Sequence, residues 1–116
     1  YIIKGKNKKA LFIPDIDKWE KWDKNLIDLV EEFDYLLLDA TFYDSKEINR
    51  DINEIPHPLV TETMTLLDSL SLEAKNKVYF IHMNHTNPML DPDSELSKLV
   101  KSKGYNIARL GQKLYL

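Results

Sequence analysis

The chain has 116 residues, of which 43% are hydrophobic and 30% charged, and its formal net charge is -3. These values are typical of one globular domain over residues 1–116, and they argue against nucleic acid as a partner and against a membrane-spanning segment of ~20 apolar residues. The absence of cysteine excludes disulfides and thiolate metal ligands and favours a reducing compartment, so we expect a cytoplasmic protein.

The first third of the chain alternates short apolar runs with one helical pattern. Residues 1–4 and 10–13 flank a polar Gly-Lys-Asn-Lys-Lys turn, which predicts a β-hairpin. A capping-box pattern with Asp17 as the N-cap then predicts one helix over residues 17–32. The apolar run over residues 35–38 predicts the next strand.

The rest of the chain begins with a polar segment over residues 43–58, which contains two prolines and is predicted to be a long loop of functional length. The elements predicted after it are a helix over 59–70, a strand over 78–81, an irregular loop over 84–92, a helix over 94–102 that stops at Gly104, and a closing pair of segments over 106–110 and 113–116.

Three of the apolar runs end at a side chain that can bind a metal or transfer a proton. These side chains are Asp15, Asp39 and His82. Continuous apolar runs of this length indicate strands that are buried on both faces, and the carboxyl ends of such strands meet at one edge of an α/β sheet. The sequence therefore predicts a metal or acid–base site at that edge.

Each of these residues also has a purely structural interpretation. Asp15 is equally suited to share helix capping with Asp17, and Asp39 is suited to bond backbone amides at the end of a strand. A single histidine such as His82 is more often a satisfied polar residue than a metal ligand. His57, between two prolines, is suited to an exposed loop.

Several short segments of the sequence resemble those of one known family. IHMNHTNPML from Ile81 is similar to the signature IH-x-NNTNP-x-L of the pyrroloquinoline quinone biosynthesis protein B group, a branch of the metallo-β-lactamase superfamily, with His85 where the group usually has asparagine. LFIPDIDKW, LLLDATF, IPHP and GYNIARLGQKLYL resemble further segments of the group in the same order. The resemblance spans nearly all of the chain.

This resemblance implies an α/β fold in which two sheets pack face to face with helices outside. The chain would form half of that αββα sandwich, with one mixed sheet and helices on its outer face. By the same resemblance, Asp15 takes the place of an aspartate that can bridge two metals, and His82 that of the last metal-ligating histidine. Asp39 matches an acidic residue that orients a ligand.

The resemblance also implies roles for the loops beside these residues. His85 is expected to act with Asp39 in catalysis. Asn84 and Asn87, together with His57, are expected to lie in the loops that contact a small-molecule or peptide-derived substrate.

One departure from the family is large, because the metal motif H-x-H-x-D-H is absent from the 116 residues. In the family this motif lies in the amino-terminal half. The chain also opens directly on a strand-like run at Tyr1, so we expect it to be the carboxyl-terminal half of a longer protein. Two ligands alone make a poor metal site, so one or two ions of zinc, iron or manganese are expected only with the amino-terminal half as partner.

The reaction expected of the completed site is metal-assisted hydrolysis of an ester, phosphoester, lactone or peptide-like bond. Oxidative chemistry in quinone cofactor biosynthesis stays open as an alternative, as does a non-catalytic interaction module. A signalling receiver domain is disfavoured, because the chain between Asp15 and Asp39 has room for only one helix.

An excised half-fold should expose an apolar sheet face, and we expect this face to be covered either by self-association into a homodimer or by a tightly held partner fragment. The residues expected on that face are drawn from Phe12, Leu36, Leu38, Phe80 and Ile107.

Overall fold

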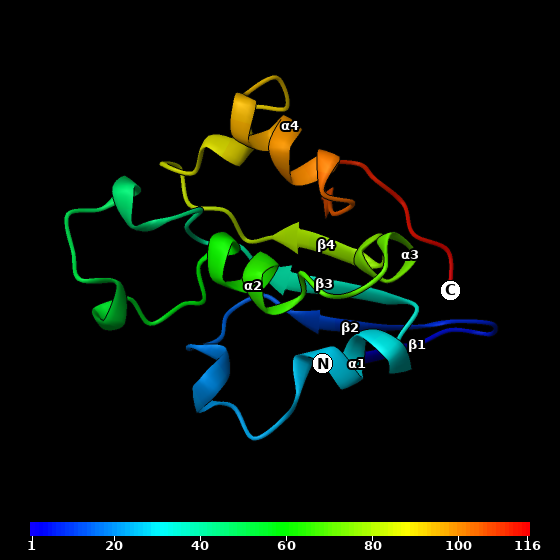
Figure 1. Cartoon of the computed structure of the whole chain (residues 1–116). Helices are drawn as coiled ribbons and strands as arrows, with labels where there is room; N and C mark the ends of the chain where they lie inside the picture. Colours follow the sequence, from blue (N-terminus) through cyan, green and yellow to red (C-terminus); the bar gives the residue numbers. More distant parts are fainter.

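The computed structural model describes all 116 residues, and its centre is one mixed five-stranded sheet (Figure 1). Its strands are β1 (Ile2–Lys4), β2 (Lys9–Ile13), β3 (Tyr35–Asp39), β4 (Val78–Ile81) and β5 (Asn106–Ile107). They lie in chain order, with β1 antiparallel to β2 and all other neighbours parallel. The predicted mixed α/β fold is confirmed.

The helices lie in the connections between the parallel strands. These are the 3-10 helix η1 (Trp19–Lys21) and α1 (Leu26–Glu32) before β3, α2 (Val60–Leu66) and α3 (Leu72–Lys75) before β4, and α4 (Glu95–Ser102) before β5. Three more 3-10 helices, η2 (Ser45–Glu47), η3 (Ile52–Glu54) and η4 (Pro88–Leu90), lie in the loops. None of the helices is long and apolar enough to cross a membrane.

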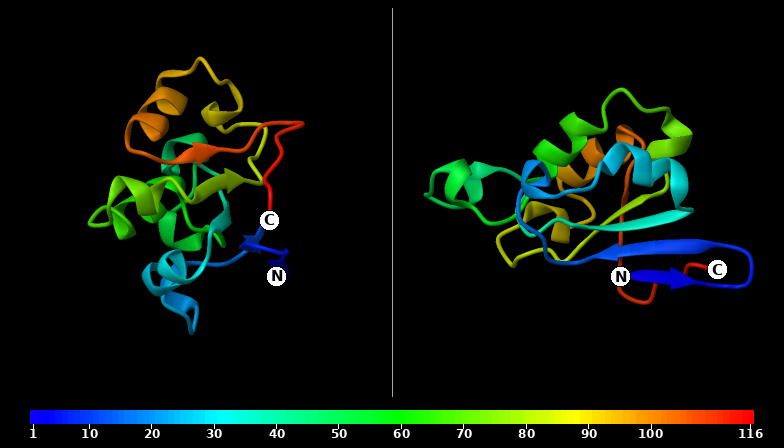
Figure 2. Two further views of the ribbon diagram at one scale, coloured as in Figure 1. Left: turned by 90° about the vertical axis from the view of Figure 1, so that its right-hand side faces the viewer. Right: turned by 90° about the horizontal axis from the view of Figure 1, so that it is seen from below.

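All four α-helices cover one face of the sheet (Figure 2). The reason is topological, because parallel crossovers share one hand and the strand order here never reverses. Helices therefore accumulate on one side. The segment after β5 crosses the opposite side, which carries no helix.

The covered face holds the core. Side chains alternate along each strand, so every second residue of β3 and β4 lies under the helices, and these residues are fully buried: Leu36, Leu38, Val78 and Phe80. The intervening residues Leu37, Tyr79 and Ile81 are half-buried on the helix-free face, together with Phe12 of β2.

This alternation corrects one prediction. Leu36, Leu38, Phe80 and Ile107 were expected on the uncovered face, but they are buried and belong to the core cluster. Only Phe12 of the predicted set is half-buried. In a run of four apolar residues the sequence carries no sign of which parity faces the helices, so the choice was made only by folding.

The first predicted helix is shorter than its pattern indicates. Residue Asp17 does not cap it, because its carboxylate accepts the Lys18 N–H and pairs with Lys21. The chain instead makes the one-turn η1, leaves the helical conformation at Trp22, and restarts at α1 with the side chain of Asn25 as N-cap. Local Asn capping outweighed the continuous apolar pattern.

Two other predicted elements also differ. The predicted second helix over residues 59–70 ends early, because α2 stops at Leu66. A separate helix that was not predicted, α3, then begins where Ser71 accepts the Ala74 N–H as its N-cap. After β5, residues 108–116 form no strand. The third helix is confirmed as α4, with Ser94 as its N-cap and Gly104 at a φ of 99° beyond its end.

The contact between η1 and α2 yields a test of the core. The indole N–H of Trp19 donates to the hydroxyl of Thr63 at 2.9 Å, and both residues are buried. Thr63→Val keeps the shape but leaves the indole N–H unpaired, so we expect the free energy of unfolding to fall by about 1–3 kcal/mol.

Thr65→Val is the matched control, since Thr65 lies on the same helix but is exposed. It should change the stability by about 0.5 kcal/mol or less. Urea unfolding followed by tryptophan fluorescence measures both variants. Equal losses of unfolding free energy in the two variants would show that the buried hydrogen bond does not contribute to stability.

Candidate metal centre

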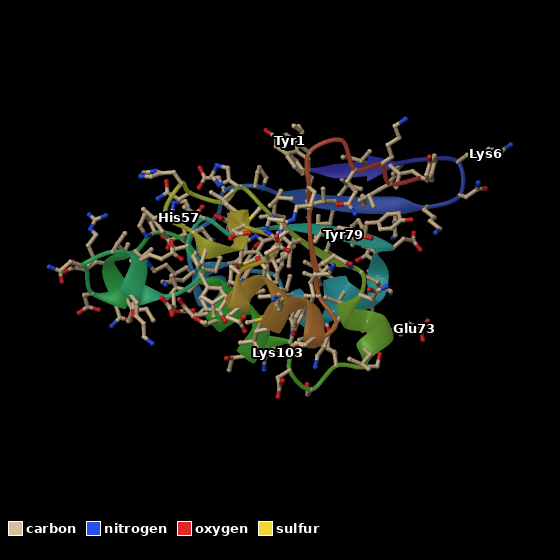
Figure 3. The ribbon with its side chains drawn as sticks, turned by 90° about the horizontal axis from the view of Figure 1, so that it is seen from above. Tyr1, Lys6, His57, Glu73, Tyr79 and Lys103 are labelled. Atoms are coloured by element: carbon tan, nitrogen blue, oxygen red, sulfur yellow. The ribbon has the colours of Figure 1, made fainter.

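The carboxyl ends of β2, β3 and β4 meet at one edge of the sheet, and three predicted site residues lie there. Asp15 follows β2, Asp39 is the last residue of β3, and His82 follows β4. Parallel pairing places Asp39 opposite Ile81, directly before His82. Figure 3 shows His57 at this end of the molecule, whereas Lys6, in the lysine-rich turn between β1 and β2, lies at the far end.

The centre of this edge is the carboxylate of Asp39, which is fully buried. Its Oδ1 accepts the backbone N–H of Thr41 at 2.8 Å and the hydroxyl of the same residue at 2.6 Å. Its Oδ2 accepts the N–H of Ile16 at 3.2 Å and lies 2.8 Å from Nδ1 of His57. Each oxygen therefore has two partners, as a buried carboxylate requires.

The pair formed by Asp39 and Thr41 contacts two imidazole rings through the same ring atom. Nδ1 of His57 lies beside Asp39, and Nδ1 of His82 lies 3.0 Å from the Thr41 hydroxyl oxygen. That hydroxyl gives its proton to Asp39, so its oxygen accepts from His82. Both rings then carry their proton on Nδ1, which leaves Nε2 with a free lone pair on each.

The backbone of His82 is unusual. Its φ is 62°, and it is the only residue other than glycine with a positive φ. This left-handed conformation costs a residue with a side chain about 1–2 kcal/mol. Strain of this kind is concentrated at functional positions, where the surrounding structure holds it.

Asp15 completes the cluster from the solvent side. Its side chain is 70% exposed, and its Oδ1 lies 3.4 Å from Nδ1 of His57. One donor atom each from Asp15, Asp39 and His57 lie within 4.8 Å of one another. Carboxylate and imidazole donors at this spacing suit zinc, iron or manganese, so the residues present fit such an ion.

The structure therefore groups residues that the sequence had placed in different roles. The two strand-end aspartates meet, and Asp39 also lies 3.7 Å from His82. His57 was expected only in a substrate loop, yet it contacts both aspartates. The only sequence feature that marked His57 was the segment IPHP. Because His57 lies in a long loop, the strand pattern could not predict its position.

The loop after β4 divides into a structural and an accessible part. Asn87 is buried, and its side chain donates to the carbonyl of Ala40 at 2.7 Å and accepts from Met89 N–H, so it fastens the loop to the end of β3. Asn84 donates its backbone N–H to the Thr41 carbonyl. His85 is exposed at the tip of the loop.

Comparisons with known proteins agree with this geometry. Residues 1–83 match a model described as the beta-lactamase superfamily domain. Coenzyme PQQ synthesis protein B from Pseudomonas fluorescens is 33% identical over 100 residues, covering 80% of this chain and 32% of the relative. The protein of the same name from Pseudomonas syringae pv. tomato matches with the same identity and coverage. The chain thus spans about a third of these relatives.

A solved structure gives the same fold. The crystal structure of Zn²⁺-bound PqqB from Methylobacterium extorquens matches with a TM-score of 0.73 and 21% sequence identity. The match covers 99% of this chain and 42% of that chain.

The strained conformation of His82 can be tested by glycine substitution. Glycine adopts a positive φ freely, so His82→Gly relieves strain that partly offsets the lost hydrogen bond and the added chain entropy. His82→Ala loses the same ring but keeps the strained positive φ, so it is the matched comparison. We expect His82→Gly to have a free energy of unfolding at least as high as that of His82→Ala, by up to about 1 kcal/mol. At His85, whose φ is not positive, glycine should instead be less stable than alanine by about 0.5–1 kcal/mol. Chemical denaturation measures the four variants, and the same glycine penalty at both positions would refute the strain.

Proposed function

The chain belongs to the metallo-β-lactamase superfamily, and from this premise we propose that it is the carboxyl-terminal part of a metal-dependent hydrolase. In this proposal it supplies late metal ligands and residues of the substrate loop. The observation that carries the proposal is the convergence of Asp15, Asp39 and His57 at the carboxyl edge of the sheet, with donor atoms within 4.8 Å.

The ligands would come from the exposed side of the cluster. We assign His82 and Asp15 as ligands, and we add His57 because Asp39 holds its Nδ1 and leaves Nε2 available. Asp39 and Thr41 then act as positioning residues, which fix the tautomer and direction of both rings. A bound zinc, iron or manganese ion would polarise the scissile group and lower the pKa of a bound water towards ~7.

The loop after β4 would meet the substrate. His85 is exposed and Asn84 is half-buried, so both are available to a small-molecule or peptide-derived substrate. Asn87 is committed to the backbone of Ala40 and Met89, so in our proposal it holds the loop rather than the substrate.

The partner of this chain would cover its helix-free sheet face. Phe12, Leu37, Tyr79 and Ile81 form an apolar surface there. Alternation along β3 puts Asp39 on that same side, so whatever covers the face also adjoins the candidate site. We propose an amino-terminal part of the same protein as the occupant, with a second copy of the chain as the alternative.

A second candidate function is a metal-dependent oxidative step in quinone cofactor biosynthesis. It is favoured by the relatives that match over 80% of the chain, which are named as PQQ synthesis proteins. The two candidates differ in their consumption of oxygen, because hydrolysis needs only water. Oxygen uptake by the metal-loaded full-length protein therefore separates them.

Calorimetric zinc titration tests the metal site. We expect the 116-residue chain to bind zinc weakly, and a protein that adds the amino-terminal part to bind it tighter by orders of magnitude, because each added ligand replaces a water. In that protein, His82→Ala and His57→Ala should reduce both zinc affinity and turnover. Asp39→Asn should lower zinc affinity or turnover on the order of 10–100-fold, as expected of a residue that orients a ligand.

His85→Ala is the matched control, because His85 is an exposed histidine on the same edge. It should leave zinc affinity unchanged and reduce only turnover. Tight stoichiometric binding by the 116-residue chain, abolished by His85→Ala, would show that the ligands are assigned wrongly.

A further inference from the structure

A buried lysine lies three residues after Asp15. The side chain of Lys18 is only 4% exposed, and its Nζ lies 2.5 Å from Oε1 of Glu62. Lysine is almost never buried without a partner, because its charge loses its hydration. The ion pair is therefore a specific feature of this fold rather than a surface contact.

The same oxygen of Glu62 has a second partner. Oε1 accepts the backbone N–H of Leu59 at 3.2 Å, at the amino terminus of α2. One carboxylate oxygen thus holds both the ammonium group of Lys18 and the first turn of α2. The next residue pair reinforces the contact, because the indole of Trp19 bonds the hydroxyl of Thr63.

These contacts join the two loops that carry the candidate ligands. Lys18 continues the turn that begins at Asp15, and Leu59 follows His57 with only a proline between them. Pro58 has a fixed φ and restricts the backbone of His57 before it, so the start of α2 limits the approach of His57. The ion pair of Lys18 and Glu62, which lies outside the site, thus limits how far Oδ1 of Asp15 can move from Nδ1 of His57, 3.4 Å away.

We propose that Lys18 and Glu62 are positioning residues, and that their ion pair, the Lys18–Glu62 clamp, sets the spacing of Asp15 and His57 for metal binding. This inference rests on the proposed function, since it assigns the clamp a role towards the same site. Neither residue contacts the metal cluster itself, so the clamp acts through the two loops.

The clamp has a metal-free signature. The N–H of Ile16 donates to Asp39 only while the turn after β2 stays against the site. Releasing Lys18 should loosen this turn and speed amide exchange at Ile16 about tenfold more than at Leu36. The Leu36 N–H lies in the centre of the sheet, bonded to Lys77, and reports global opening.

The decisive experiment compares Lys18→Met with Lys21→Met in the 116-residue chain. Methionine keeps most of the length of the unbranched side chain and removes the charge. Lys21 lies in the same segment, but its pair with Asp17 is exposed, so its loss should have little effect. Zn²⁺ is titrated while the imidazole signals of His57 and His82 are followed by nuclear magnetic resonance.

We expect Lys18→Met to raise the dissociation constant for Zn²⁺ on the order of tenfold and to speed exchange at Ile16, while Lys21→Met does neither. Should Lys18→Met fail to fold, Glu62→Gln replaces it, because the amide keeps an acceptor for Leu59 and loses the ion pair. Glu62→Gln should also raise the dissociation constant for Zn²⁺ and speed exchange at Ile16, both by a smaller factor than Lys18→Met.

The outcomes separate this inference from the proposed function. Exchange that accelerates equally at Ile16 and Leu36, with zinc affinity as in Lys21→Met, would mean that the ion pair only stabilises the fold, and the inference would be wrong. A wild-type protein that binds no Zn²⁺ even when the amino-terminal part is added would overturn the metal assignment instead. In that case, exchange at Ile16 alone still decides whether the clamp holds the turn.

Discussion

The buried carboxylate of Asp39 is the constraint on which the rest of the site depends. It lies at the end of a central strand, where it is removed from water, so each of its oxygens must find donors within the protein. Those donors come from three separate segments: Ile16 after β2, Thr41 after β3, and His57 before α2. Satisfying one buried charge therefore gathers three loops at a single point. The hydrogen bonds of the carboxylate account for this convergence.

The topology decides where this point lies relative to the core. Because the parallel strands follow each other in one direction, all α-helices cover one face, and the core fills the space between them and the sheet. Asp39 follows the alternation of β3 onto the opposite face. The candidate site is thus continuous with an apolar surface that the chain leaves without helices. The chain spans about a third of the length of the relatives that it matches.

Two further structural features position site residues that lie outside the strands. The left-handed conformation of His82 turns the chain at the end of β4, so that its ring reaches Thr41 instead of continuing the strand. Glu62 holds the start of α2, and with it the proline-bounded approach of His57. Both features lie at the ends of secondary-structure elements, where a small change of backbone direction moves a side chain by several ångströms. The geometry of the site therefore depends on the backbone conformation at the ends of β4 and α2.

The sequence by itself determined the strands and the edge at which they end. Apolar runs buried on both faces are recognisable without a structure, so Asp15, Asp39 and His82 were predicted at one edge. The stop of the last helix at Gly104 was also predicted, because helix termination depends on local sequence. Which parity of Leu36 and Leu37 faces the helices was decided only by the tertiary structure, since both are leucine. The break before Asn25 followed from a side-chain cap that competes with a continuous helical pattern. His57 was expected only in a substrate loop, and its contacts with the two aspartates were not predicted. Its place depends on a contact with Asp39, 18 residues earlier in the chain, and no local pattern encodes a contact that exists only when a long loop folds back.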